Sequence, residues 1–233
     1  MLDEERSLSH ACRVMDLETA IAERRSVRAF LPRAVPREVL TRIFARAQSA
    51  PSWCNIQPWR VWLASGEARN RFISKMVESA NARMPMPDVP FPGEYPEPYA
   101  THRRACGKAL YEAMGVERHD REGRHAAWMR NFVAFDAPHV ALVGIDRRFG
   151  PYAALDVGCW LESVMLLATA EGLSTCAMAS LATYPDVARE TLKIPEEIAL
   201  LFGIAIGYED TSAKANACRT TREPLAANLD FVE

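Results

Sequence analysis

The sequence predicts one domain, residues 1–233, of the α+β or α/β class, in which helices flank one central β-sheet. A length of 233 residues suits a single large domain. Hydrophobic residues make up 49% of the chain and charged residues 25%, which is typical of a soluble protein with a sizeable core. Segments of helical periodicity alternate with short β-prone segments, and no internal repeat or long linker divides them.

The first third of the chain predicts three helices and a strand after an N-terminal extension, residues 1–15. Apolar residues on one face predict the first helix, and Pro36 suits the first turn of the second, whose apolar residues form a stripe. The expected elements are helix Asp16–Arg24, helix Pro36–Gln48, loop Ala50–Pro58, strand Trp59–Ala64 and helix Glu67–Ala82.

The middle of the chain begins with a proline-rich loop, Met84–Pro98. Its six prolines cannot donate a regular backbone ladder. A loop of this length in a compact domain is either functional or disordered. Two helices are expected to follow, over Tyr99–Met114 and Asp120–Phe135.

The last third predicts a long apolar helix, Tyr152–Ala170, between strands. It is apolar on nearly every face, so it is expected to be buried on all sides, in the core of one chain or as the spine of a dimer. The other expected elements are strand Pro138–Ile145, strand Ser174–Met178, helix Pro185–Leu192, strand Ala199–Tyr208 and a polar tail after Asp210.

Charge and composition exclude several classes of protein. The net charge of −2 gives no basic footprint for a nucleic-acid partner. The longest apolar stretch, 153–170, is interrupted by Asp156 and Glu162, so no membrane span is expected. The six cysteines form no CxxC pair and no metal-ligand spacing with histidine, and we expect reduced thiols in the cytoplasm.

Three segments far apart in the sequence carry residues suited to binding chemistry. Arg24–Phe30 holds three arginines and a hydroxyl, which match phosphate oxygens, although such runs are usually solvated. Ala50–Trp59 offers two carboxamides that can bind the edge of a planar heterocycle, or simply stabilise a turn. The third segment, Asn216–Leu225, is a tail with two arginines.

Together with two further stretches, these segments resemble the nitroreductase family of FMN-dependent flavoenzymes. The resemblance spans roughly residues 16–233 and rests on five motifs in order. They are RRSxRxF at Arg24–Phe30, APSxxNxQPW at Ala50–Trp59, AP before a strand at Ala137–Ile145, a long apolar helix ending in xGL at Tyr152–Leu173, and GxxxGY…N…R…R.PL at Gly203–Leu225.

The resemblance implies an α+β fold with a central, mainly antiparallel sheet in an intertwined homodimer. The long apolar helix would lie at the subunit interface, and FMN would be bound by both subunits. NADH or NADPH would reduce FMN at N5, and a small aromatic acceptor, a nitroaromatic or a quinone, would then be reduced in a ping-pong reaction. No acid–base triad is needed, so no catalytic side chain and no metal are assigned.

The resemblance also implies the cofactor contacts. Arg24, Ser26 and Arg222 would bind the phosphate and ribityl chain, with Arg25 beside them. Arg28 would lie at the N1–O2 edge of the flavin and stabilise the charge of its reduced form. Asn55 would bind the pyrimidine ring, assisted by Gln57.

Two departures from the family pattern change the expected contacts. Many members carry a Glu-Gly pair whose backbone amides face flavin N5 and O4, and Ala179 and Ser180 stand there in this sequence. A basic residue two positions before Arg222 is replaced by threonine, and Arg219 is the nearest substitute.

Several roles stay open from sequence alone. Trp53 is expected either beside the flavin and substrate or in the core, a catalytic Cys54 is disfavoured, and His125 lines the pocket or lies at the surface. Alternatives to the proposed reaction are a reductive dehalogenase or enone reductase of the same fold, a non-catalytic flavin-binding protein, and a structural dimer without a cofactor.

Overall fold

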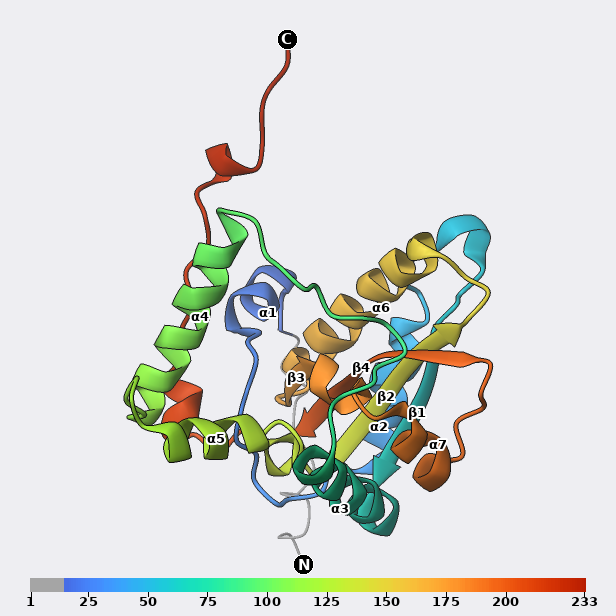
Figure 1. Cartoon of the computed structure of the whole chain (residues 1–233). Helices are drawn as coiled ribbons and strands as arrows, with labels where there is room; N and C mark the ends of the chain where they lie inside the picture. The colour runs from blue at the N-terminus through green and yellow to red at the C-terminus, as the bar shows by residue number, and fades with distance from the viewer. Residues whose placement is uncertain (1–14) are drawn as a thin grey trace, which may run out of the picture.

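A four-stranded antiparallel sheet forms the centre of the computed structural model, which describes residues 15–233 (Figure 1). The spatial order is β1-β2-β4-β3. The strands are β1 (Arg60–Ser65), β2 (His139–Asp146), β3 (Ser174–Met178) and β4 (Ile198–Gly207). Every neighbouring pair is antiparallel. The α+β prediction is therefore confirmed, and the α/β alternative is wrong because no strand pair in this sheet is parallel.

Helices cover both faces of the sheet. Helices α2 (Arg37–Ala47) and α6 (Pro151–Ala170) pack on one face, where Trp160 is fully buried. Helices α3 (Gly66–Ala82) and α7 (Pro185–Leu192) pack on the other, together with Phe132 and Tyr184. Alternate residues of the central strand β2 enter these two cores, because successive strand side chains point to opposite faces.

Three helices lie outside these layers. Helix α1 (Leu17–Glu23) packs against α6. Helices α4 (Tyr99–Met114) and α5 (Arg121–Met129) form an arm at one side of the molecule, and the C-terminal tail runs along α4 and then extends beyond the body (Figure 1). These peripheral segments lie around the edge of the sheet that is formed by β3.

At two glycines of β4, neighbouring side chains pack so closely on the backbone that no Cβ atom would fit. A Cβ on Gly203 would meet the side chain of Leu181 at 2.7 Å, and one on Gly207 would meet Pro138 at 2.7 Å and Phe30 at 3.2 Å. The GxxxGY motif of the sequence is thus a packing requirement. The absence of side chains at these two positions allows the segment before β2 and the segment after β3 to pack directly on β4.

One sequence-based expectation about a helix is wrong, and another stays untested within one chain. The helix expected over Asp120–Phe135 ends at Met129, and the turn that follows leads into a left-handed stretch at residues 134–136, with φ of 52° to 65°. This turn buries Phe135. The expectation that α6 is buried on all sides stays a prediction, because it allowed burial in a dimer; within one chain the side chains of Tyr152 and Leu155 are 64% and 65% exposed.

The remaining expected elements are present with their ends shifted by at most two residues. Residues 84–98 contain no helix or strand, as their prolines predict. One described helix, α6, is long and apolar enough to cross a membrane, and it packs against α1, α2 and β3. The N-terminal extension lies almost wholly outside the described residues.

Candidate functional site

The basic segment Arg24–Phe30 lies alongside the edge strand β3. Ser26 forms a parallel bridge with Thr175, and the N–H of Val27 donates to the carbonyl oxygen of Thr175 at 3.0 Å. Val27 is buried in the core. Because side chains of an extended segment alternate, Ser26 and Arg28 project to the side opposite Val27. The Ser-Val-Arg order therefore anchors the segment and leaves two polar side chains facing outward.

The first two arginines of this segment are tied to the body of the protein. Arg24 caps α1 and forms an ion pair with Glu162 of α6 at 3.6 Å. Arg25 donates to both carboxylate oxygens of Glu209. The Nε atom of Arg25 is buried and has no hydrogen-bond partner among residues 15–233. Arg25 therefore holds the fold together at this place, and one of its donors remains unsatisfied.

The guanidinium group of Arg28 differs, because it forms no ion pair within residues 15–233. Its one hydrogen bond goes to the carbonyl of Ser26 at 3.3 Å. The thiol of Cys176 lies close to Arg28 and Ser26, and burial raises its pKa to about 11. Cys176 therefore stays a neutral thiol at pH 7, and no anionic side chain of residues 15–233 pairs with the positive charge of Arg28.

A buried asparagine joins this segment to the C-terminal tail. The side chain of Asn216 accepts from the N–H of Arg28 at 2.7 Å and donates to the carbonyls of Ala29 and Asp210 at 2.9 Å. Sequence reasoning missed this residue as part of the site. One feature of the sequence could have indicated it: Asn216 is the asparagine of the motif at Gly203–Leu225.

Strand β3 leads directly into the 3-10 helix η3 (Ala179–Ala182), where Ala179 and Ser180 lie. The first N–H groups of a helix have no partner within it. The N–H groups of Ala179 and Ser180 make no loop or cap bond to the described residues. The hydroxyl oxygen of Ser180 is buried and also lacks a partner in residues 15–233. Two free backbone donors thus lie at the end of the strand beside Arg28.

The two tail arginines are both exposed and have different hydrogen-bond partners. Arg219 donates to the carbonyl of Asn216 at 2.8 Å, so it stays close to the Arg28 segment. Arg222 is exposed, and its hydrogen bonds go to its neighbours Thr220 and Thr221. The Nε2 atom of His102 lies 3.0 Å from a carboxylate oxygen of Glu223, which brings this part of the tail against α4.

The loop with Asn55 and Gln57 is strained and exposed. Its residues Cys54, Asn55 and Gln57 have φ of 48°, 56° and 46°, which is unusual for side chains other than glycine. The amide Nε2 of Gln57 donates to the carbonyl of Asn55 at 3.1 Å. Trp53 is 56% exposed and meets the ring of Tyr152 edge-on at 4.7 Å. The core alternative for Trp53 is therefore wrong in this chain.

This loop and the Arg24–Arg28 segment contact different parts of α6. The loop is bonded to Asp156 and Arg24 to Glu162, which is six residues further along the helix. Six residues of an α-helix correspond to about 9 Å of rise and about 120° of rotation. These contacts gather Arg24, Arg25, Ser26, Arg28, Ala179, Ser180 and Arg219 around β3, whereas Asn55 and Gln57 lie on a loop that contacts α6 at a different residue.

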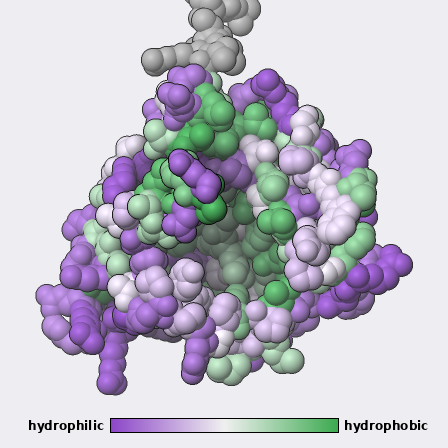
Figure 2. Space-filling model, turned by 90° about the horizontal axis from the view of Figure 1, so that it is seen from above, coloured by the Kyte–Doolittle hydropathy of each residue, from purple (hydrophilic) through white to green (hydrophobic). Residues whose placement is uncertain are grey.

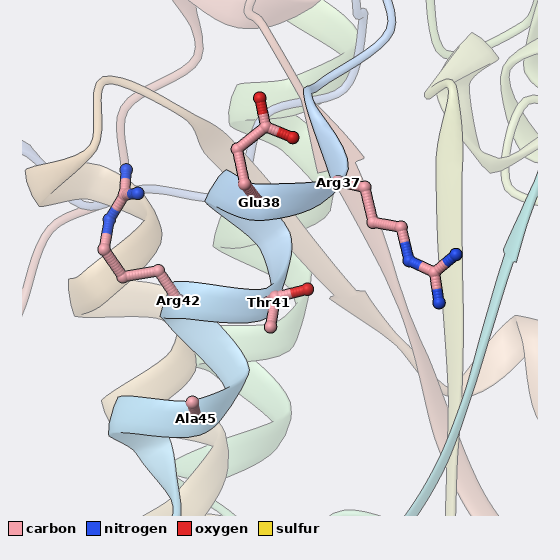
Figure 3. A pocket seen from close by; sticks show the side chains of 5 residues that line it. All are labelled: Arg37, Glu38, Thr41, Arg42 and Ala45. Atoms are coloured by element: carbon pink, nitrogen blue, oxygen red, sulfur yellow. The ribbon is translucent and has the colours of Figure 1, made fainter.

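The molecular surface has two hollows that can be described. Figure 2 shows a hollow near the middle of the face seen from above, with hydrophobic residues on its rim. A separate depression of about 480 Å³ beside α2 is lined by Arg37, Glu38, Thr41, Arg42 and Ala45 (Figure 3). All five residues belong to a single helix surface, and none is a predicted site residue. His125 lies exposed on α5, with its ring 5.8 Å from that of Trp128.

The fold and the arrangement of these segments agree with a family match over most of the chain. The model of the nitroreductase family matches residues 21–208. The chain belongs to the nitroreductase family.

Particular relatives are similar along nearly the whole length. A nitrobenzene nitroreductase of Ectopseudomonas oleovorans is 33% identical over 220 residues, which cover 93% of this chain and 96% of that protein. The crystal structure of the FMN- and NADPH-dependent nitroreductase NfnB from Sphigopyxis sp. strain HMH has a TM-score of 0.89 at 34% identity, covering 94% of this chain and 100% of that one. The FMN-dependent NfnB from Mycobacterium smegmatis, in complex with NADPH, also has a TM-score of 0.89 at 34% identity, covering 93% and 97%.

Proposed function

We propose that this protein is an FMN-dependent oxidoreductase that takes a hydride from NADPH or NADH and reduces small nitroaromatic compounds, with quinones as further acceptors. The observation that carries the proposal is the gathering of cations and free N–H donors from three distant segments at β3, in a chain that aligns end to end with nitroaromatic reductases. FMN, when bound, supplies the hydride-accepting and hydride-donating centre at its N5 atom.

The donor set at β3 fits a flavin nucleotide. A flavin needs cations at its phosphate and hydrogen-bond donors along the polar edge of its ring. The chain supplies the Arg28 guanidinium without a carboxylate partner, two free N–H groups at the start of η3, and a buried Nε donor on Arg25 that no described residue satisfies. Unsatisfied polar groups cost free energy, which a bound anion would offset.

The phosphate end of the cofactor is assigned to the arginines nearest the tail. Arg24, Ser26 and Arg222 would hold the phosphate and ribityl hydroxyls, and Arg25 and Arg219 would add positive charge beside them. Arg24 has the geometry for this, since its ion pair with Glu162 uses Nε at 3.6 Å and leaves the terminal nitrogens available. Guanidinium groups suit phosphate because they donate in a planar fork.

The ring end is assigned to Arg28, Ala179 and Ser180. Arg28 would lie at the N1–O2 edge, where it stabilises the negative charge of the reduced cofactor. The N–H groups of Ala179 and Ser180 would face N5 and O4. The exposed position of Ala179 leaves room for the ring at this point. Asn55 and Gln57 would bind the pyrimidine edge.

A second copy of the chain completes this site. Within one chain the Asn55 loop and Arg24 contact α6 at residues that are six positions apart, which supports assigning Asn55 and Arg28 of one flavin site to different subunits. Helix α6 also exposes the large apolar side chains of Tyr152 and Leu155, and α1 exposes Leu17 and Ile21. We infer a homodimer with α6 at its interface, in which each flavin is bound by both subunits.

Exposed aromatic side chains bear on the identity of the acceptor, and the state of the cysteines bears on the cellular compartment. Tyr99 and Trp128 are exposed on the α4–α5 arm, and Phe91 and Tyr95 are exposed in the proline-rich loop. Such side chains favour a planar aromatic acceptor. The five described cysteines are all free thiols, which agrees with the reducing cytoplasm.

Steady-state kinetics with nitrobenzene and NADPH test the reaction. Donor and acceptor use the same face of the flavin in turn, so initial-rate plots at several fixed acceptor concentrations should give parallel lines. Intersecting lines would require both substrates to be bound together. The absence of nitrobenzene-dependent NADPH oxidation by the FMN-loaded protein would contradict the proposed activity.

A further inference from the structure

Helix α6 carries two acidic residues in an otherwise apolar sequence, and one of them is buried without a cation. Asp156 is 8% exposed and forms no ion pair within residues 15–233. Both of its carboxylate oxygens lie 3.2 Å from the backbone nitrogen of Trp53. Burying a charged group costs free energy unless it is hydrogen-bonded. The hydrogen bond from the N–H of Trp53 therefore compensates part of the cost of burying this carboxylate.

The segment that Asp156 holds has an unfavourable backbone. Cys54, Asn55 and Gln57 all adopt left-handed conformations, with φ between 46° and 56°. Such conformations persist where the surroundings determine them, and they gather at ligand-binding sites. The loop therefore needs contacts that keep both its shape and its place on the protein.

The bonds within the loop account for its shape. The N–H of Gln57 donates to the hydroxyl of Ser52 at 3.0 Å, and the N–H of Asn55 donates to the carbonyl of Ser52 at 3.0 Å. None of these bonds reaches another element. They fix how the loop is folded and leave its position on α6 to other contacts.

Two residues of α6 account for the position of the loop. Asp156 bonds to the backbone of Trp53, and the ring of Tyr152 meets the Trp53 ring edge-on at 4.7 Å. Tyr152 and Asp156 are four residues apart, so they share one face of the helix. Both contacts converge on Trp53, two residues before Asn55.

We propose that Asp156 is a positioning residue that holds the Ser52–Gln57 loop on α6 and thereby places Asn55 against the pyrimidine ring of FMN. This inference rests on the proposed function and adds to it a residue that touches neither cofactor nor substrate. The carboxylate acts through the backbone of Trp53, so an acceptor oxygen at this position is required and its charge is not.

Three variants separate this role from a general effect on folding. Asp156→Ala removes the acceptor, and Asp156→Asn keeps one acceptor oxygen at the same place. Ser163→Ala is the matched control on the same helix, because the Ser163 hydroxyl bonds only to the Cys159 carbonyl of its own helix at 3.0 Å. Circular dichroism and thermal unfolding would establish that each variant is folded at the temperature of the assay.

The first measurement is hydrogen exchange of the Trp53 amide in the protein without FMN. We expect exchange in Asp156→Ala to be about tenfold or more faster than in the wild type, because the N–H loses its acceptor. Asp156→Asn should restore most of the protection, and Ser163→Ala should match the wild type. Equal protection in Asp156→Ala and the wild type would overturn the inference.

The second measurement is FMN affinity, followed by quenching of flavin fluorescence. We expect Asp156→Ala to bind FMN about tenfold or more weakly and to shift the visible spectrum of the bound flavin, since Asn55 no longer holds the ring edge. Asp156→Asn should stay within about threefold of the wild type. Equal FMN affinity and spectrum in Asp156→Ala would overturn the link from Asp156 to the flavin.

The two measurements also separate this inference from the proposed function. A wild-type protein that binds no FMN would overturn the proposed function and the flavin part of the inference, and Trp53 exchange would still decide whether Asp156 holds the loop. A wild type that binds FMN, with an unaffected Asp156→Ala, would overturn the inference alone.

Discussion

At the scale of single residues, the arginines of the basic segment divide between structure and free charge. Arg25 is bound by Glu209, whereas Arg28 has no carboxylate partner within residues 15–233. Their neighbour Val27 fixes the segment by entering the core. We therefore assign Arg25 mainly to the fold and propose Arg28 as the cation that would act on a bound flavin.

Replacing Arg28 should therefore change the redox chemistry of the flavin. Arg28→Ala removes the charge that stabilises the reduced form, so the midpoint potential of bound FMN should become more negative. Potentiometric titration against reference dyes measures it. Arg148→Ala is the control, because Arg148 is paired with Asp146 on an exposed turn. A potential that stays the same in Arg28→Ala would contradict the place assigned to this residue.

Replacing Arg222 should weaken cofactor binding and leave the fold intact. Its hydrogen bonds go only to Thr220 and Thr221, so no other element depends on it. Loss of a charged contact to phosphate costs about 1.5–3 kcal/mol, and Arg222→Ala should weaken FMN binding accordingly. Calorimetric titration with FMN measures the effect. Unchanged affinity would show that the phosphate lies elsewhere.

Residues of the site were predictable where they form contiguous motifs. Arg24, Ser26 and Arg28 could be selected because charge and hydroxyl groups cluster in the sequence. Asn216 and Asp156 could not be assigned, because their partners are 188 and 103 residues away. The role of a single polar residue in an apolar helix or in a tail can be assigned only when the segment that it contacts is known.

At the scale of elements, the proline-rich loop is fixed at one end by a buried carboxylate. Asp88 accepts from Arg147 at 2.6 Å, from Arg189 at 2.8 Å and from the N–H of Leu200 at 3.0 Å. Burial alone would raise the pKa of Asp88, but these hydrogen bonds together hold it below its ordinary value. The N–H of Met86 donates to the carbonyl of Thr183, so this end of the loop lies over the segment that follows η3.

Replacing Asp88 should reduce stability in a way that depends on pH. Asp88→Asn leaves two arginines without their carboxylate, and we expect the free energy of unfolding at pH 7 to fall by about 1–3 kcal/mol. The folded-state pKa is lowered, so this stabilisation is present above the unfolded-state pKa of about 4 and is lost as the pH falls through the folded value.

Urea unfolding of the wild type and of Asp88→Asn between pH 7 and pH 3 measures this dependence. The two curves should differ by a constant amount down to about pH 5 and converge below about pH 4. A difference that does not change with pH would show that the ionised carboxylate is not the source of the stability.

Most elements were predictable from the sequence, for a physical reason. Helices with an apolar stripe and the strand Ser174–Met178 depend on local patterns, and their boundaries agree closely with the structure. The helix over Asp120–Phe135 was extended too far because three residues other than glycine, at positions 134–136, take positive φ. No local signal in the sequence marks that turn, which is stabilised by burial of Phe135.

At the scale of the whole molecule, the exposed apolar surface of α6 predicts association. From the sequence alone, this helix could be buried either in the core of one chain or at a dimer interface. The structure buries Val157 and Trp160 within the chain and exposes Tyr152 and Leu155. A hydropathy pattern does not distinguish neighbours from the same chain from those of a second one, so the exposed face of α6 supports the dimer interface, which stays a prediction.

A charge on that surface should separate the subunits. Leu155→Glu places a carboxylate at the proposed interface, and sedimentation should change from the mass of two chains to that of one, with loss of FMN binding. Asn81→Glu on α3 adds the same charge on the other side of the sheet and should sediment like the wild type. A wild type that sediments as a monomer while binding FMN tightly would contradict the composite site.

The most direct test of the central claim, a flavin oxidoreductase with its cofactor held at β3, is the visible spectrum of the purified protein. We predict a yellow protein, or one that becomes yellow on addition of FMN, whose flavin bands bleach when NADPH or NADH is added without oxygen and return on addition of nitrobenzene. A colourless protein that takes up no FMN, or bound flavin that neither nucleotide bleaches, would contradict the account.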